Sequence, residues 1–188
     1  MSLFLHIATG LGLALAAGIR PFTPALMAGA LARSHVLFDF RGTSYAFLQS
    51  AEFLLVVACL FVALAILRRR GLIDWVATGG VGLAGLLFAG VLAAHHETAW
   101  PGLIAGVAAA TLAQLTARAV LEGASARLQD NAARFAVTLY ADAAALLLAL
   151  AAWFAPPLSI LALAFFASLL WVQRGRALMA LAGLRVSR

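Results

Sequence analysis

Seven apolar runs, each close to the length of a membrane-crossing helix, determine what this chain can fold into. A transmembrane α-helix needs about 17 to 25 mostly apolar residues. The runs occupy residues 3–19, 22–38, 46–67, 72–94, 100–117, 132–154 and 158–173. With 65% hydrophobic and 11% charged residues, the chain falls well short of the roughly 25% charge typical of a soluble domain. The pattern excludes a soluble monomer and predicts an all-α integral membrane protein with about seven transmembrane helices.

The spans form one predicted domain, because no linker and no change of composition divides the chain. We place this transmembrane domain at residues 1–173, followed by a basic tail at 174–188. The tail interleaves arginines with leucines, which predicts a helix lying in the membrane interface. The span at 22–38 is the least regular, because it contains Arg33 and His35. A re-entrant hairpin therefore competes there with a full crossing.

The basic residues indicate how the spans are oriented. All 13 are arginines, and arginines collect in cytoplasmic loops. If all seven spans cross and the N-terminus is outside, the inner ends receive Arg20, Arg68, Arg69, Arg70, Arg118, Arg127, Arg134, Arg174, Arg176, Arg185 and Arg188. Only Arg41 then falls in an outer loop, and Arg33 lies within a span. We predict the N-terminus outside and the C-terminus cytoplasmic, in a bacterial cytoplasmic membrane.

Two similar hexapeptides suggest an internal repeat. PALMAG at Pro24–Gly29 and PGLIAG at Pro101–Gly106 lie 77 residues apart. Each places a proline near the start of a span and contains a small-xxx-small pair suited to close helix packing in lipid. The shift relates a half at about 1–70 to a half at about 72–154 in opposite orientation, as in inverted-repeat transporters, and leaves 158–173 as an extra span. A chain this rich in Ala, Leu and Gly also produces such matches by coincidence.

The stretch Leu13–Arg33, LALAAGIRPFTPALMAGALAR, and the later PGLIAG segment carry a resemblance to a known family. They resemble a bacterial membrane-protein family catalogued as domain of unknown function 4126. The similarity extends over most of the chain. It implies an uncharacterised polytopic membrane protein, and it transfers no catalytic residue.

Asp142 is the most distinctive polar residue, because it lies in the middle of the span at 132–154. A charge at this depth is costly and by default marks a functional site with a partner. It is interpreted either as a proton- or cation-coupling site or as a carboxyl group hydrogen-bonded to a neighbouring helix. The candidate partners are Thr9, Arg20, Thr23, Thr111 and Gln114. The first turn after the Arg20-Pro21 break also offers free N–H groups that could bind an anion.

Arg33 and Glu52 are further candidates for a substrate or ion pathway. They lie about 7.5 and 9 Å from the outer ends of adjacent spans, at 1.5 Å per residue. Their similar depths allow an ion pair between antiparallel helices. The alternative is that Arg33 extends to the headgroups and Glu52 caps a helix from a loop.

Four histidines and two carboxyl groups gather near the predicted outer face. They are His6, His35, His95, His96, Asp39 and Glu97. Imidazole and carboxylate groups suit divalent cations, and histidine titrates near neutrality, so a metal-binding or pH-sensing vestibule is one hypothesis. The two adjacent histidines are poor candidates for ligands of one shared ion in a helix, because the side chains of His95 and His96 would point about 100° apart. The alternative is a simple polar turn before Trp100 and Pro101.

Three functions compete. The leading interpretation is a small transporter or channel for an ion or small solute, with Asp142, Arg20, Thr23, Arg33 and Glu52 along its pathway. The second is a membrane scaffold or assembly factor that transports nothing, and the third is an intramembrane metal-dependent hydrolase, which would need the histidines to converge. The sequence carries no nucleotide-binding or hydrolase motif, so no cofactor is predicted. The expected partners are the lipid bilayer and an ion or small solute, and nucleic acid is not expected, because the arginines lie at span ends.

Overall fold

The computed structural model describes residues 3–34, 40–67, 70–126 and 130–186. Within these residues the chain forms seven α-helices, one short 3-10 helix and no strand. The elements are α1 (Leu3–Ile19), α2 (Phe22–Arg33), η1 (Ala46–Gln49), α3 (Ala51–Leu67), α4 (Arg70–Ala94), α5 (Ala99–Ala126), α6 (Asn131–Phe154) and α7 (Leu158–Val186). The predicted all-α class is confirmed.

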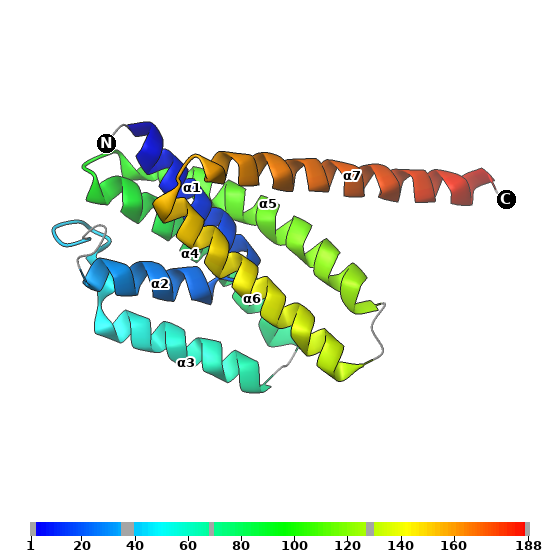
Figure 1. The fold of residues 1–188 in the computed structure, drawn as a ribbon, viewed down its shortest axis with the longest axis horizontal. Helices are drawn as coiled ribbons and strands as arrows, with labels where there is room; N and C mark the ends of the chain where they lie inside the picture. Colours follow the sequence, from blue (N-terminus) through cyan, green and yellow to red (C-terminus); the bar gives the residue numbers. More distant parts are fainter. Residues whose placement is uncertain (1–2, 35–39, 68–69, 127–129, 187–188) are drawn as a thin grey trace.

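The helices run back and forth, so that successive helices point in opposite directions (Figure 1). One end of the bundle holds the N-terminus, residues 40–50 and the turn between α4 and α5, and we call it the N-side end. The C-terminus lies beyond the opposite end, which we call the C-side end. The last part of α7 extends past the other helices there (Figure 1).

The N-terminal helix α1 is the centre of the bundle. It packs against α2, α4, α5, α6 and α7. Its residues from Ala8 to Gly18 are buried, apart from the half-buried Leu11. Most of them are Ala, Gly or Leu, and the small side chains allow the close backbone approach that holds helices together in lipid.

Two glycine crossings show how close this packing is. A Cβ atom added to Gly18 of α1 would lie 2.8 Å from the Cα of Ala110 on α5. A Cβ atom added to Gly106 of α5 would lie 2.9 Å from the Cα of Gly85 on α4. Neither position has room for a side chain, so α1, α4 and α5 form the tightly packed core of the molecule.

The outer faces of the peripheral helices are apolar. Large exposed side chains include Leu55 and Val62 on α3, Tyr140, Leu147 and Phe154 on α6, and Leu161 and Trp171 on α7. Soluble monomers rarely expose large contiguous apolar patches, whereas lipid-facing helices do. Three stretches of the described chain, Ala99–Ala124, Phe135–Phe154 and Leu158–Gly175, are long and apolar enough to cross a membrane. The structure therefore supports a membrane protein.

The second predicted span differs from its prediction. Helix α2 covers 12 residues and ends at Arg33, where the N–H of Ser34 bonds to the carbonyl oxygen of Ala30 and the Ser34 hydroxyl donates to that of Leu31. At 1.5 Å per residue its length is about 18 Å, against a hydrocarbon core of about 30 Å. The run at 22–38 therefore does not form one continuous crossing helix, because polar Arg33 and Ser34 end it early.

Other boundaries also shift. The run at 46–67 divides into η1 and α3. Helix α5 continues past the predicted end at residue 117 to Ala126 and takes in most of the connector expected there. Helix α7 continues to Val186, so the tail extends the last span as one helix. The side chains from residue 176 onward lie outside the described part of the structure, and the interfacial placement of the tail stays a prediction.

The inverted repeat is not confirmed. Pro24 and Pro101 do occupy the same place, the third residue of α2 and of α5. The following glycines have different surroundings, because Gly106 packs on Gly85 of α4, whereas Gly29 packs on Leu48 of η1 and on α3. Helix α5 packs extensively against α4, whereas α2 packs only sparsely against α1.

Candidate functional site

Asp142 forms an ion pair with Arg20. The Nε atom of Arg20 lies 3.0 Å from the Oδ1 atom of Asp142. The two side chains are 30% and 27% exposed, respectively. The Nε–H has no hydrogen-bond partner in the described structure, so its contact with the carboxylate is an ion pair rather than a hydrogen bond.

The pair joins a chain turn to the middle of a long helix. Arg20 is the residue between α1 and α2, and Asp142 is the twelfth of the 24 residues of α6. At 1.5 Å per residue, about 18 Å of helix separates Asp142 from Phe154 at one end of α6, and about 16 Å separates it from Asn131 at the other. The α1–α2 turn thus lies halfway along α6, and does not reach its C-side end.

Helix α2 begins next to this ion pair with its first turn uncapped. Pro21 precedes the helix and provides no side-chain hydrogen bond to it. The N–H groups of Phe22 and Thr23 have no intrahelical carbonyl available, as at any helix start. Among the described residues the hydroxyl of Thr23 is buried and has no hydrogen-bond partner. The site at this turn therefore combines the guanidinium of Arg20, the carboxylate of Asp142 from α6 and several unsatisfied donors.

Two of the other candidate partners of Asp142, Thr9 and Thr111, bond elsewhere. The Thr9 hydroxyl donates to the Leu5 carbonyl oxygen at 2.9 Å, and the Thr111 hydroxyl donates to that of Val107 at 2.7 Å. Both bonds lie within one helix turn. Arg20 is thus the predicted candidate that the structure places in contact with Asp142.

The histidines come together only in part. His6 of α1 stacks on His95 at the end of α4, with ring centroids 3.7 Å apart and planes at 24°. The Nδ1 atom of His95 lies 2.8 Å from the carbonyl oxygen of Val91, and because that oxygen can only accept, Nδ1 donates. His6 is only 9% exposed, and neither of its ring nitrogens has a hydrogen-bond partner in the described structure.

The remaining vestibule candidates do not complete a metal site. His96 is exposed, with a φ of 60° that turns the chain out of α4. Glu97 lines a separate, mostly apolar pocket of about 280 Å³ between α1, α4 and α5. His35 and Asp39 lie outside the described residues. Within the part of the chain that is described, no group of three histidine, cysteine or carboxylate residues could hold a metal ion.

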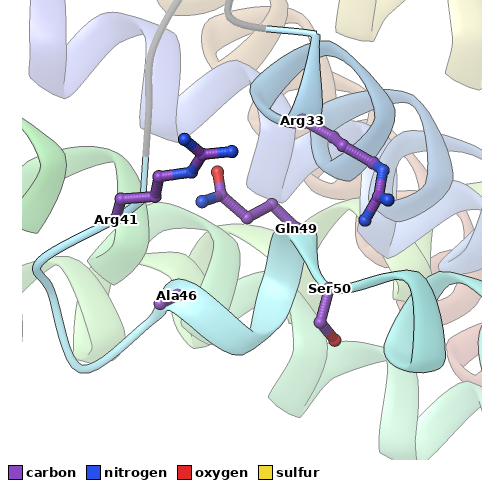
Figure 2. A pocket seen from close by; sticks show the side chains of 5 residues that line it. All are labelled: Arg33, Arg41, Ala46, Gln49 and Ser50. Atoms are coloured by element: carbon purple, nitrogen blue, oxygen red, sulfur yellow. The ribbon is translucent and has the colours of Figure 1, made fainter.

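Arg33 lies at a different site, a pocket of about 400 Å³ at the N-side end of α2. The pocket is lined by Arg33, Arg41, Ala46, Gln49 and Ser50. Figure 2 shows the guanidinium of Arg41 beside the amide of Gln49, and Arg33 on the other side of Gln49 with its guanidinium directed away from both. Two basic side chains from separate segments thus contribute to one pocket.

The Arg33–Glu52 ion pair, one of two interpretations of these residues, is absent from the described structure. Both side chains are exposed. Glu52 lies in the first turn of α3, where a negative charge favours the helix dipole. The helix cap is Ser50, whose Oγ accepts from the N–H of Phe53 at 3.2 Å.

Arg41 and Gln49 are the site residues that the sequence analysis missed. Gln49 gives no sequence signal, since its position depends on the fold of residues 40–50. Arg41 does give one, because it is the single arginine that the charge distribution assigns to an outer loop. An exception to an otherwise consistent charge pattern could have marked this pocket.

Searches among curated proteins and among solved structures each gave no significant match. The family model described as domain of unknown function DUF4126 matches residues 7–175. The match includes α1 to α6 and the first part of α7, and thus both the Arg20–Asp142 pair and the Arg33–Arg41 pocket. The chain belongs to the DUF4126 family.

Proposed function

We propose that the protein is a membrane transporter or channel for an ion or small solute, with the Arg20–Asp142 pair as its central polar site. The observation that carries the proposal is the position of this pair. A guanidinium and a carboxylate 3.0 Å apart lie halfway along α6, a helix apolar and long enough to span a membrane. Charged groups at that depth are costly and are characteristic of ion and substrate pathways.

The α1–α2 turn has the properties of a broken helix in a transporter. In such proteins two half-helices meet near the midplane, and their free backbone groups and charges bind the solute. Helix α2 is about 18 Å long, close to half of a bilayer's hydrocarbon thickness plus the interface. We infer that α1 and α2 form a hairpin that enters from the N-side face and turns back at the level of Asp142.

This hairpin keeps the proposed orientation unchanged. Two full crossings and one re-entrant hairpin both return the chain to the side on which it started. In either case residues 40–50 lie on the same face as the N-terminus, which we propose is the outside, and the basic C-terminal tail at 174–188 lies in the cytoplasm. The hairpin differs in placing Arg20 within the membrane, where it needs Asp142, instead of in a cytoplasmic loop.

The pair also suggests how a solute could bind. Arg20 and the first-turn N–H groups of α2 attract anions, and Asp142 occupies that position when no solute is bound. A small anion that reaches the turn would compete with the Asp142 carboxylate for Arg20. Protonation of Asp142 would weaken its hold on Arg20 and so couple proton movement to anion binding.

Flux through proteoliposomes tests this proposal. The purified chain is reconstituted with an internal pH dye, and gradients of protons, chloride, nitrate and acetate are applied in turn. We expect the wild type to dissipate at least one gradient and Asp142→Asn to lose that flux by about tenfold or more. The matched control is Glu122→Gln, an exposed carboxylate on α5, which should retain full flux.

Three outcomes would reject the proposal. They are no flux with any of these gradients, full flux in folded Asp142→Asn, or an equal loss in Glu122→Gln. Each would favour the scaffold interpretation, in which the ion pair only fastens the α1–α2 turn to α6.

A further inference from the structure

We propose that His6 and His95 form a pH-sensitive contact, which holds the N-side end of α1 against α4 at neutral pH and releases it in acid. The proposal concerns the opposite end of α1 from the Arg20–Asp142 pair and does not depend on transport. It rests on two observations. The imidazole rings of His6 and His95 are stacked, with centroids 3.7 Å apart, and His6 is buried without a hydrogen bond among the described residues.

The stack joins the ends of two helices. His6 is the fourth residue of α1, and His95 directly follows the last residue of α4. The Nδ1–H of His95 donates to the carbonyl oxygen of Val91, one turn earlier in α4, so this ring is fixed to the end of its helix. The ring of His6 is placed by packing, because neither of its nitrogens is bonded. The stack is therefore a polar contact through which the N-side end of α1 meets α4.

The surroundings of His6 suit a neutral ring. The side chain is only 9% exposed, and no described acceptor lies within hydrogen-bond distance of either nitrogen. Protonation gives the ring a second N–H and a positive charge, and a buried charge without an acceptor is strongly disfavoured. Histidine changes its charge between about pH 8 and pH 5. Mild acid therefore brings a charge to a position that the folded structure does not compensate.

Stacking adds repulsion between like charges. If both rings are protonated, two positive charges face each other with ring centroids 3.7 Å apart. Repulsion over such a distance is strong where bulk water is excluded. Separation of the rings removes the repulsion and lets water reach the nitrogens of His6. Acid thus favours movement of the N-side end of α1 away from α4.

The described groups around the stack do little to offset a charge on it. Glu97 follows His95 by two residues, yet it forms no ion pair with either histidine in the described structure. The N-side halves of α4, α5, α6 and α7 contain no titratable side chain. The α-amino group, His35 and Asp39 lie outside the described residues. The other titratable side chains described at the N-side end are Arg33, Arg41, Tyr45 and His96.

The remainder of the α1–α4 contact does not depend on titratable groups. One turn beyond His6, Gly10 lies so close to α4 that an added Cβ atom would overlap the ring of Phe88. From Gly10 to Ile19, α1 contains no titratable side chain. Acid should therefore release the first turns of α1 and leave the rest of the helix packed in the core.

The location of the stack decides which compartment it senses. It lies at the N-side end of the bundle, on the face that we propose is outside. In this orientation the contact responds to the pH outside the cell. The assignment of the compartment rests on the proposed orientation, whereas the contact itself does not.

Thermal unfolding of the purified full chain in detergent tests the contact. Between pH 7.5 and pH 5.5, a range above that of ordinary carboxyl groups, the unfolding temperature of the wild type should fall by about 3 °C or more. His6→Phe keeps an aromatic ring that cannot be protonated, and His95→Gln removes the other titratable ring. Each should reduce this fall by about half or more, because the folded state then excludes fewer protons. The control is His96→Asn, which should retain the full fall, since His96 is exposed and asparagine tolerates its φ of 60°.

A distance measurement tests the movement without altering either histidine. In a Cys59→Ser background, which removes the one cysteine, spin labels are attached at Phe4→Cys on α1 and Trp100→Cys on α5, both exposed positions. Double electron–electron resonance in nanodiscs should give a longer and broader distribution of distances at pH 5.5 than at pH 7.5. The control pair, Val62→Cys on α3 and Leu147→Cys on α6, is also exposed and should give the same distribution at both.

Several results would overturn the proposal. They are an unchanged unfolding temperature of the wild type at pH 5.5, the full fall in folded His6→Phe or His95→Gln, an equal reduction in His96→Asn, or an unchanged distance between positions 4 and 100. The distance measurement decides the matter even if both histidine variants fail to fold. None of these experiments records flux, so this proposal and the proposed function fail separately.

Discussion

An arginine lies at each end of helix α2, and the two differ in whether the side chain is paired within the protein. At its start, Arg20 lies against Asp142, halfway along α6, and both side chains are less than one-third exposed. At its end, the Arg33 side chain is exposed and lines a pocket. The guanidinium of Arg20 is paired within the protein, whereas the side chain of Arg33 is exposed to the surroundings.

In the proposed membrane arrangement, depth decides the role of each charge. Within the hydrocarbon, an unpaired guanidinium is too costly to maintain, so a partner must be built into the fold. Near the headgroups the cost falls, so an exposed guanidinium such as that of Arg33 is tolerated there. The same 12-residue helix therefore connects a paired arginine with an exposed one, and mutations at its two ends should behave differently.

The largest expected effect on stability comes from displacing the α1–α2 turn, where Arg20 lies. Gly18 sets where α1 crosses α5, two residues before Arg20, and a Cβ atom there would meet the backbone of Ala110. Gly18→Leu should lower the free energy of unfolding by about 3 kcal/mol or more, through overpacking against backbone. The control is Gly82→Ala on α4, where nothing lies within 4 Å of an added Cβ. Thermal unfolding in detergent compares the two, and equal stabilities would contradict the close crossing.

A smaller loss of stability should follow when Arg20 loses its partner Asp142. Asp142→Leu leaves Arg20 uncompensated and should destabilise the protein by about 2 kcal/mol, less than the roughly 3–5 kcal/mol of a fully buried pair. Asp142→Asn keeps an acceptor for Arg20 and should cost about 1 kcal/mol or less. The double variant Arg20→Leu/Asp142→Leu should regain part of the loss, because no charge remains unpaired. Strict additivity in chemical unfolding would remove the ion pair from this account.

The smallest effect on stability is expected at the shallow end. Arg33→Gln removes an exposed charge and should change the free energy of unfolding by no more than about 0.5 kcal/mol. The same unfolding assay measures it beside Asp142→Leu. A loss as large as that of Asp142→Leu would show that Arg33 is compensated within the fold, and the contrast between the two ends would disappear.

Much of the helical framework was predictable, because each helix needs only a local apolar run. The run at 3–19 coincides with α1, and that at 132–154 differs from α6 by one residue. The end of α2 was harder to place, since Arg33 and Ser34 interrupt an otherwise apolar run, and sequence hydropathy cannot decide whether a helix continues through them. The depth of the α1–α2 turn was not predictable, because it is set by packing between α1 and α6, two segments more than 100 residues apart.

The candidate site was likewise predictable only in part. Asp142 stood out because a carboxylate in an apolar span is unusual, and Arg20 was one of several possible partners. The contact between them depends on how far α1 extends along α6, which the sequence does not encode locally. The His6–His95 stack and the Arg33–Arg41 pocket likewise join residues from separate elements. Their histidines and arginines can be listed from the sequence, but only the tertiary fold selects which of them meet.

Cross-linking measures the position of the α1–α2 turn most directly. In a Cys59→Ser background, Arg20→Cys is combined with Asp142→Cys in the middle of α6, or with Ala132→Cys at its C-side end. Membranes are then treated with a short bifunctional thiol reagent. The account predicts efficient cross-linking of positions 20 and 142 and little of 20 and 132, because the turn lies halfway along α6. Cross-linking of 20 to 132 without cross-linking to 142 would place the turn at the C-side end and contradict the hairpin and its midplane site.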